Sequence, residues 1–173
     1  MTSKRDLGPI LAIAGAAIAI IAVIAGFIII GGPGDARDRR LDEMTTGRLM
    51  DIFNVVQCAY NGTGAAPSTV EAAANAQGRI AKNEPLQPCN FGMPPERLAV
   101  LPGRTPPDPG NISYEANAPG RVTLCANYRR PREAEDCNGI CNRDPRTSIF
   151  STAHPAGVHC YDLELTQSQV VQQ

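Results

Sequence analysis

The first feature of the chain is an uninterrupted apolar run from Leu7 to Ile30. Twenty of these 24 residues are hydrophobic and none is charged. At about 1.5 Å per residue, a helix of this length can cross a hydrocarbon core about 30 Å thick. Its backbone groups would bond internally, as lipid requires. The pattern predicts a single-pass transmembrane helix, residues 7–30, after a short cytoplasmic tail, residues 1–6.

Two alternatives concern processing and orientation. A cleaved signal peptide has a shorter apolar run, and cleavage after Ala25 would leave a strongly apolar new terminus, so we expect an uncleaved signal-anchor. The Lys and Arg count beside the span favours a large domain inside the cell, but long domains follow that rule weakly. Small residues four positions apart allow close helix pairing, so a homo-oligomer is one alternative, but an alanine-rich span produces such pairs by chance; they are Ala12/Ala16, Gly15/Ala19 and Ala22/Gly26.

An amphipathic pattern follows a glycine- and proline-rich linker, residues 31–35. Over residues 36–61, apolar residues recur at steps of three and four, which predicts a helix with one apolar face. The apolar positions are Leu41, Met44, Leu49, Ile52, Phe53, Val56, Ala59 and Tyr60. The charged positions of the opposite face, which we expect to be solvated, include Arg39, Arg40, Asp42, Glu43, Arg48 and Asp51.

The rest of the chain alternates turns with short regular elements. A second helix is expected after Pro67, with Ser68 as its cap and Glu71 reaching back to the cap. Nine prolines within residues 84–120 predict little regular structure there. Strand patterns occupy residues 112–116, 122–128 and 158–165, and the first two are joined as a hairpin by residues 117–120. Residues 166–173 form a polar tail.

Composition narrows the class of protein. The formal net charge is −1, which gives no electrostatic reason to bind nucleic acid. Beyond the apolar run the chain has few large apolar residues and no Trp, too little for a large two-domain enzyme. No paired carboxylates, phosphate loop or Ser/His/Asp arrangement stands out, so we predict no catalytic residues, no cofactor and no enzymatic activity. The excess of Arg over Lys favours a bacterial source.

Six cysteines lie beyond the apolar run. An even number in a core-poor domain favours disulfides formed in an oxidising compartment. Six cysteines permit 15 pairings, which spacing alone does not resolve. Cys137 and Cys141 flank an Asn-Gly turn and could form a local bridge. Cys125 and Cys160 lie in strand-like runs and could join neighbouring strands, which leaves Cys58 with Cys89.

A metal or thiol-redox site is the alternative use of these residues. The soft ligands Cys137, Cys141, His154, His159 and Cys160 fall within 24 residues. A three-residue spacer between two cysteines is allowed in zinc sites, but no second cysteine pair follows. We therefore predict disulfide bonds and no metal site, and keep the metal or thiol-redox site as the alternative.

The order of elements resembles that of pilins and pseudopilins, in which a long N-terminal helix is half in the membrane and half packed on a small antiparallel sheet. Asp108-Pro109-Gly110-Asn111-Ile112-Ser113-Tyr114 is similar to the Asp-Pro-x-Gly-x-x-Tyr turn of major pseudopilins. Ala36–Tyr60, followed by Gly64, Pro67 and Val70, resembles their helix and its exit. That family carries a Gly-Phe-Thr-Leu-x-Glu-type processing site just before its span, and no Glu stands at the corresponding place here.

These features lead to one combined expectation. The chain is predicted to be an α+β, disulfide-braced, pilin-like domain of about three strands, residues 36–165, in the periplasm of a bacterium. The inner-membrane bilayer holds it through residues 7–30. Its expected role is structural or interactive, with another envelope protein or a second copy as partner, as an accessory of a pilus- or secretion-like assembly. A domain facing the cytoplasm remains the topological alternative.

Overall fold

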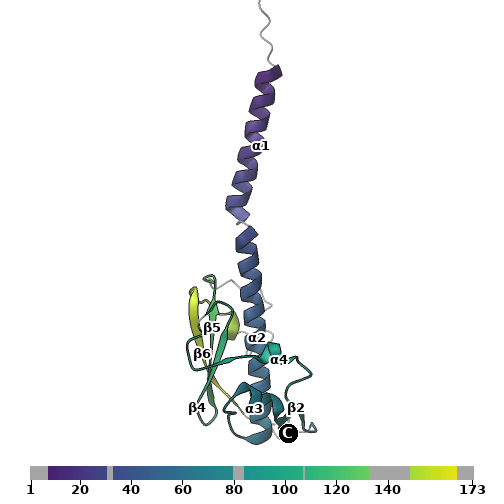
Figure 1. The fold of residues 1–173 in the computed structure, drawn as a ribbon, viewed down its shortest axis with the longest axis vertical. Coiled ribbons are helices and arrows are strands. Elements are labelled where there is room, and N and C mark those ends of the chain that lie inside the picture. The colour runs from purple at the N-terminus through teal and green to yellow at the C-terminus, as the bar shows by residue number, and fades with distance from the viewer. Residues whose placement is uncertain (1–7, 31–32, 80–83, 107, 133–148, 167–173) are drawn as a thin grey trace, which may run out of the picture. The chain divides into compact units, whose positions relative to one another are not determined.

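The structure is a computed structural model that describes residues 8–30, 33–79, 84–106, 108–132 and 149–166 (Figure 1). The chain divides into two compact units, Met1–Asp38 and Arg39–Gln173. The described part is α+β, with helices, two small sheets and two disulfide bonds. The predicted fold class is confirmed at this level.

The apolar run forms helix α1, Gly8–Ile30, so its predicted helical conformation is confirmed. Large apolar side chains along it are exposed, for example 71% for Ile13 and 68% for Ile18. None of the helices within the described residues is both long enough and apolar enough to cross a membrane. Insertion of α1 into a bilayer therefore stays a prediction, and the tail, residues 1–6, lies outside the described residues.

Helix α2, Pro33–Thr63, is longer than the predicted helix at both ends. It begins at Pro33, a residue suited to the first helical position because its missing N–H would have no partner there. Gly34 and Asp35, which we expected in the linker, are therefore helical. The helix ends at Thr63, and the next residue, Gly64, forms a left-handed cap with a φ of 74° and an N–H bond to the Tyr60 carbonyl.

The apolar face of α2 supplies one side of the hydrophobic core. Leu49, Ile52 and Val56 are fully buried, and Phe53 packs edge-on against Phe150 with 5.9 Å between ring centroids. Met44 was predicted to belong to this face but is 58% exposed. The buried stripe therefore starts a turn later than the sequence pattern indicates.

The main sheet has the strand order β3-β4-β5-β6. Its long antiparallel strands are β4 (Ile112–Ala118), β5 (Arg121–Tyr128) and β6 (Gly157–Glu164), which confirms the three predicted strands and the first hairpin. The two-residue strand β3, Leu101–Pro102, pairs parallel to β4 and was not predicted, because two residues carry no alternation and one is proline.

The two faces of this sheet differ in what covers them. Val122, Leu124 and Ala126 point to the core shared with α2. Thr123 and Cys125 point to the opposite face, here called the outer face, yet both are buried. The chain near Pro106 covers part of this face, since Asn127 donates a hydrogen bond to the Pro106 carbonyl. The outer face is therefore polar but not fully open to solvent.

Short elements complete the fold around α2. Helix α3 spans Val70–Asn75, and Thr69 caps it by accepting a hydrogen bond from the Ala72 N–H, so the predicted cap at Ser68 is wrong by one position. Both residues have a hydroxyl, and the extended backbone at Thr69 decides which one caps. The remaining elements are β1 (Gln77–Gly78), β2 (Gln87–Pro88), α4 (Pro95–Leu98) and the 3-10 helix η2 (Ile149–Ser151).

A buried disulfide joins α2 to the loop after β2. It links Cys58 to Cys89, and both residues are almost completely buried. Gly78 of β1 packs directly on this bridge, because a Cβ placed there would collide with the Cys58 carbonyl and the Cys89 sulfur. Only glycine allows this close approach.

A comparison of Gly78 with Gly47, both in the unit Arg39–Gln173, tests this packing. We expect Gly78→Ala to destabilise the protein by more than about 1 kcal/mol, because backbone atoms of Cys58 must move to admit the methyl group. Gly47→Ala should stabilise it by roughly 0.5–1 kcal/mol, because Gly47 lies inside α2 and a Cβ there meets nothing within 4 Å. Urea denaturation of both variants measures the free energies of unfolding, and equal effects would contradict the packing at Gly78.

Candidate functional site

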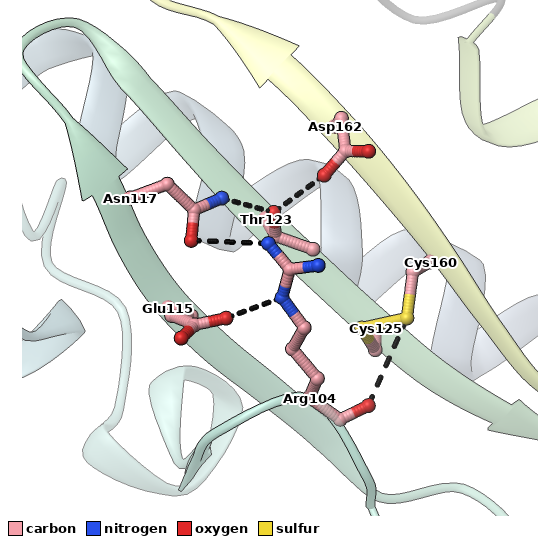
Figure 2. Close-up of a disulfide and its surroundings, with 7 residues drawn as sticks. All are labelled: Arg104, Glu115, Asn117, Thr123, Cys125, Cys160 and Asp162. Carbon is pink, nitrogen blue, oxygen red and sulfur yellow. Dashed lines mark hydrogen bonds and ion pairs between the residues drawn. A yellow bond between two sulfur atoms is a disulfide. The ribbon is translucent and has the colours of Figure 1, made fainter.

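The outer face of the sheet is built around a second disulfide, between Cys125 of β5 and Cys160 of β6 (Figure 2). The two residues are direct partners in the strand register, with their Cα atoms 4.0 Å apart. Cys125 is completely buried, whereas Cys160 is exposed. One sulfur of this bridge is therefore shielded, and the other lies at the surface of an edge strand.

A hydrogen-bonded network surrounds this disulfide and crosses three strands. Arg104 forms an ion pair with Glu115 of β4 and also donates to Asn117 (Figure 2). Thr123 of β5 donates to Asp162 of β6 and accepts from Asn117. The hydrogen bond and the charge of Glu115 raise the pKa of Arg104. Because the Arg104–Glu115 pair is exposed, its role is to position the segment over the sheet more than to stabilise the fold.

The described residues of the alternative metal or thiol-redox site do not converge on one point. Cys160 is held in a disulfide on the outer face, and its neighbour His159 points to the other side of β6, opposite Ala126. The rings of His154 and His159 have centroids 6.0 Å apart. Among the described residues, no three His, Cys, Asp or Glu side chains are grouped closely enough to hold a metal ion. Cys137 and Cys141 lie outside those residues.

His154 belongs to an aromatic cluster at the end of the sheet. Its ring stacks on Tyr128 with a centroid distance of 3.7 Å, and the Tyr128 and Tyr161 hydroxyls are 3.1 Å apart. Phe150 packs edge-on against Tyr161. Burial lowers the pKa of His154 and raises the pKa of both tyrosines. The cluster is therefore uncharged at neutral pH and acts as packing.

Charged residues of α2 that we expected to be solvated instead hold the rest of the domain. The Asp42 carboxylate accepts hydrogen bonds from the backbone N–H groups of Arg129 and Arg130, each 3.0 Å long. Arg48 donates to three backbone carbonyls, those of Arg97, Ala99 and Gly110. The sequence gives no signal for these contacts, because their partners lie at least 49 positions away.

Hollows also occur on the described surface, and two of them are lined by residues of this domain. The larger has a volume of about 680 Å³ and lies between α3, α4 and β3, with Tyr114 in its wall. The Tyr114 hydroxyl donates to the Pro67 carbonyl, and burial raises its pKa to about 12, so it stays protonated. The smaller, about 440 Å³, lies between α2 and residues 130–132 and includes Asp42 and His154. Its named polar groups already serve the fold.

These arrangements favour binding over chemistry. The buried Cys58–Cys89 disulfide and the hydrogen bonds of Asp42 and Arg48 hold α2 to the rest of the domain. The aromatic cluster is uncharged. The Cys125–Cys160 bridge and its polar network lie on the outer face, next to the edge of the sheet (Figure 2). This edge region is the candidate functional site.

Asp42 and its neighbour Glu43 allow a test of the hydrogen bonds that Asp42 makes to the backbone of Arg129 and Arg130. Asp42→Ala should cost about 1–3 kcal/mol of stability, because two backbone N–H groups lose their acceptor. Glu43→Ala, at the next position of the same helix and exposed, should change stability by less than about 0.5 kcal/mol. Thermal or urea unfolding measures both, and a harmless Asp42→Ala would contradict the assigned role of Asp42.

The lowered pKa of His154 predicts an acid-sensitive domain. The unfolded histidine titrates near 6.5, so below about pH 6.5 the unfolded state binds more protons than the folded state. Stability from this group is fully present above about pH 6.5 and is lost as pH falls from there through the folded pKa. Arg132 and His159 nearby also disfavour the charged form, whereas Asp42 favours it.

Substitution of His154 isolates this contribution. His154→Phe keeps a ring that can stack on Tyr128 but removes the titrating group. Unfolding free energies of the wild type and the variant, measured between about pH 7.5 and pH 5, should diverge, with a steeper loss in the wild type. Parallel curves for the two proteins would contradict the prediction.

Comparisons of this chain with models of protein families, with curated proteins and with solved structures returned no match. The resemblance to pilins and pseudopilins therefore stays a prediction. Inferences about function rest on the residues and contacts described above.

Proposed function

We propose that this chain is a non-enzymatic, membrane-anchored protein of the bacterial envelope, whose domain outside the cytoplasm has a structural or interaction role. The observation that carries the proposal is the pair of long-range disulfides, Cys58–Cys89 and Cys125–Cys160, in a small α+β domain. Such bridges form and persist in oxidising compartments and are rare in the cytosol. They favour the outward-facing orientation over the cytoplasmic alternative.

The proposed anchor is helix α1. It has 23 residues and no charged side chain, which gives a rise of about 34 Å. Its described apolar side chains are exposed over successive turns, with Leu11 at 69% and Ile21 at 65%. In water this exposure would be costly, whereas in lipid it would be favourable. The bilayer is therefore the partner we propose for α1.

The proposed pilin-like character rests on the order and packing of the elements. An apolar helix precedes α2, and the apolar face of α2 shares a core with an antiparallel sheet. The pilin-type processing site is missing from the sequence, so we propose an accessory of a pilus- or secretion-like assembly. We do not propose that a prepilin peptidase cleaves this chain.

The oxidation state of the cysteines tests the compartment. Isolated membranes are alkylated in denaturant without reductant, with and without prior chelator treatment, and peptide mass mapping locates the alkyl groups. We expect no alkyl group on Cys58, Cys89, Cys125 or Cys160. Alkylation of these four would overturn the proposal, because the domain would then be reduced. Labelling of Cys137 and Cys141 that appears only after chelation would instead favour the metal or thiol-redox alternative.

Carbonate extraction tests the anchor. The wild-type chain should stay in the membrane pellet at high pH, as an integral protein does. Ile18→Lys combined with Ile21→Lys should release it, because each lysine near the bilayer centre costs about 2.5–3.5 kcal/mol. Met44→Lys, on an exposed position of α2, is the matched control and should leave the protein in the pellet. Extraction of the wild type would overturn the anchoring.

A further inference from the structure

Within the described residues, the main sheet has one long edge strand, β6, and one side of it pairs with no other strand. β6 is last in the order β3-β4-β5-β6, and in the described part of the chain it pairs only with β5 (Figure 1). An edge strand presents N–H and C=O groups that can pair with a further strand. The following contacts identify which residues of β6 present these groups.

The hydrogen bonds of Asn127 fix the pattern. Its N–H donates to the Asn111 carbonyl and its carbonyl accepts from the Gly110 N–H, so Asn127 bonds toward the β4 side of β5. In antiparallel sheets alternate residues bond to opposite neighbours. Ala126 and Leu124 therefore bond to β6, through their register partners His159 and Tyr161.

The intervening residues of β6 consequently face away from β5. Their backbone N–H and C=O groups point to the free edge, and their side chains lie on the outer face. The set is Val158, Cys160, Asp162 and Glu164. The Leu165 N–H, which donates to the Gly120 carbonyl, continues the same alternation. All four side chains are exposed, and no backbone hydrogen bond to these residues comes from another described segment.

The charges along this edge select its partner. Asp162 and Glu164 are two positions apart and share the outer face. Glu164 is paired with Arg121, and Asp162 accepts a hydrogen bond from the Thr123 hydroxyl. The charge of Arg104 also acts on Asp162, but Arg104 is already ion-paired with Glu115, so these three carboxylates exceed the two guanidinium groups by one negative charge. Directly opposed residues of opposite charge stabilise strand pairing, and like charges oppose it. A strand with basic residues at alternate positions is complementary to this edge.

We propose that the free edge of β6 binds an extended segment of a partner protein, added antiparallel as a further strand, with lysine or arginine at alternate positions facing Asp162 and Glu164. The intervening positions of that segment would lie on the core side, beside Tyr161 and Leu163, and would be apolar. Main-chain hydrogen bonds would supply affinity and the side chains specificity. A second copy of this chain fits less well, since pairing two β6 edges would gather the carboxylates of both on one face.

This proposal names the partner class for the interaction role proposed above, and it rests on that role. The two are tested separately, because the oxidation and extraction experiments do not depend on strand binding. Failure of the strand to bind would leave the anchored, disulfide-braced protein intact, whereas a reduced or extractable protein would remove its proposed setting.

The test uses the full chain in detergent micelles and a fluorescent peptide of alternating lysine and valine. In an antiparallel addition, the lysines that face Asp162 also turn their own N–H groups toward β6. N-methylation of the lysine amides should therefore weaken binding at least about tenfold, measured by anisotropy, because ladder hydrogen bonds are lost. N-methylation of the valine amides should have little effect, because those groups point away from β6.

Reversing the charge at Asp162 provides a second part of the peptide-binding test. Asp162→Lys should weaken binding of the lysine peptide severalfold and improve binding of a glutamate–valine peptide. Glu71→Lys, an exposed acidic position on α3, is the matched control and should bind as the wild type does. The peptide modifications keep the test decisive if Asp162→Lys disturbs the fold.

Three results would overturn the proposal. The first is no binding of the unmodified lysine peptide. The second is binding that resists methylation of the lysine amides or that Glu71→Lys weakens equally, which would indicate general charge attraction. The third is a dimer, seen by sedimentation, that the peptide dissociates, because the edge would then belong to a second copy.

Discussion

The burial of one face of α2 against the core side of the sheet is the interaction on which the domain depends. Ile52, Val55 and Val56 on the helix and Leu124 on β5 are completely buried in one cluster. This core is small, and no tryptophan contributes to it. The two disulfides close loops of 31 and 35 residues, each constraint contributing about 3–4 kcal/mol. Against a typical total of about 5–15 kcal/mol, that contribution is decisive.

Much of this architecture follows from local sequence pattern. The helical repeat before Gly64 and the alternation in residues 122–128 each report which side of an element is buried, so the helix, the central strands and their hairpin can be predicted. The alternation also places Cys125 and Cys160 on strands that could be neighbours. It does not show that the strands are in register, which depends on the turn chemistry and on the core together.

The sequence pattern fails where a residue serves a distant partner. Asp42 and Arg48 lie on the charged side of an amphipathic helix, where solvent is the usual neighbour, yet they bind backbone groups of segments far along the chain. A carboxylate that accepts two backbone N–H groups is indistinguishable in sequence from one that meets water. Strand β3 escapes prediction for a related reason, because its two residues pair with β4, more than ten positions away along the chain. The free edge of β6 is likewise a property of topology.

The two edges of the sheet differ in how their backbone groups are covered, and that difference bears on function. On the β4 side, β3 pairs with the first residues of β4, and Arg104 binds Glu115 farther along the same strand. On the β6 side, no described strand follows, and protection comes from the charges of Asp162 and Glu164. Carboxylates at alternate positions oppose pairing with an identical edge but leave the backbone groups in place. The same residues that limit self-association therefore keep the edge open to a strand of opposite charge, so that solubility and selectivity have a common origin.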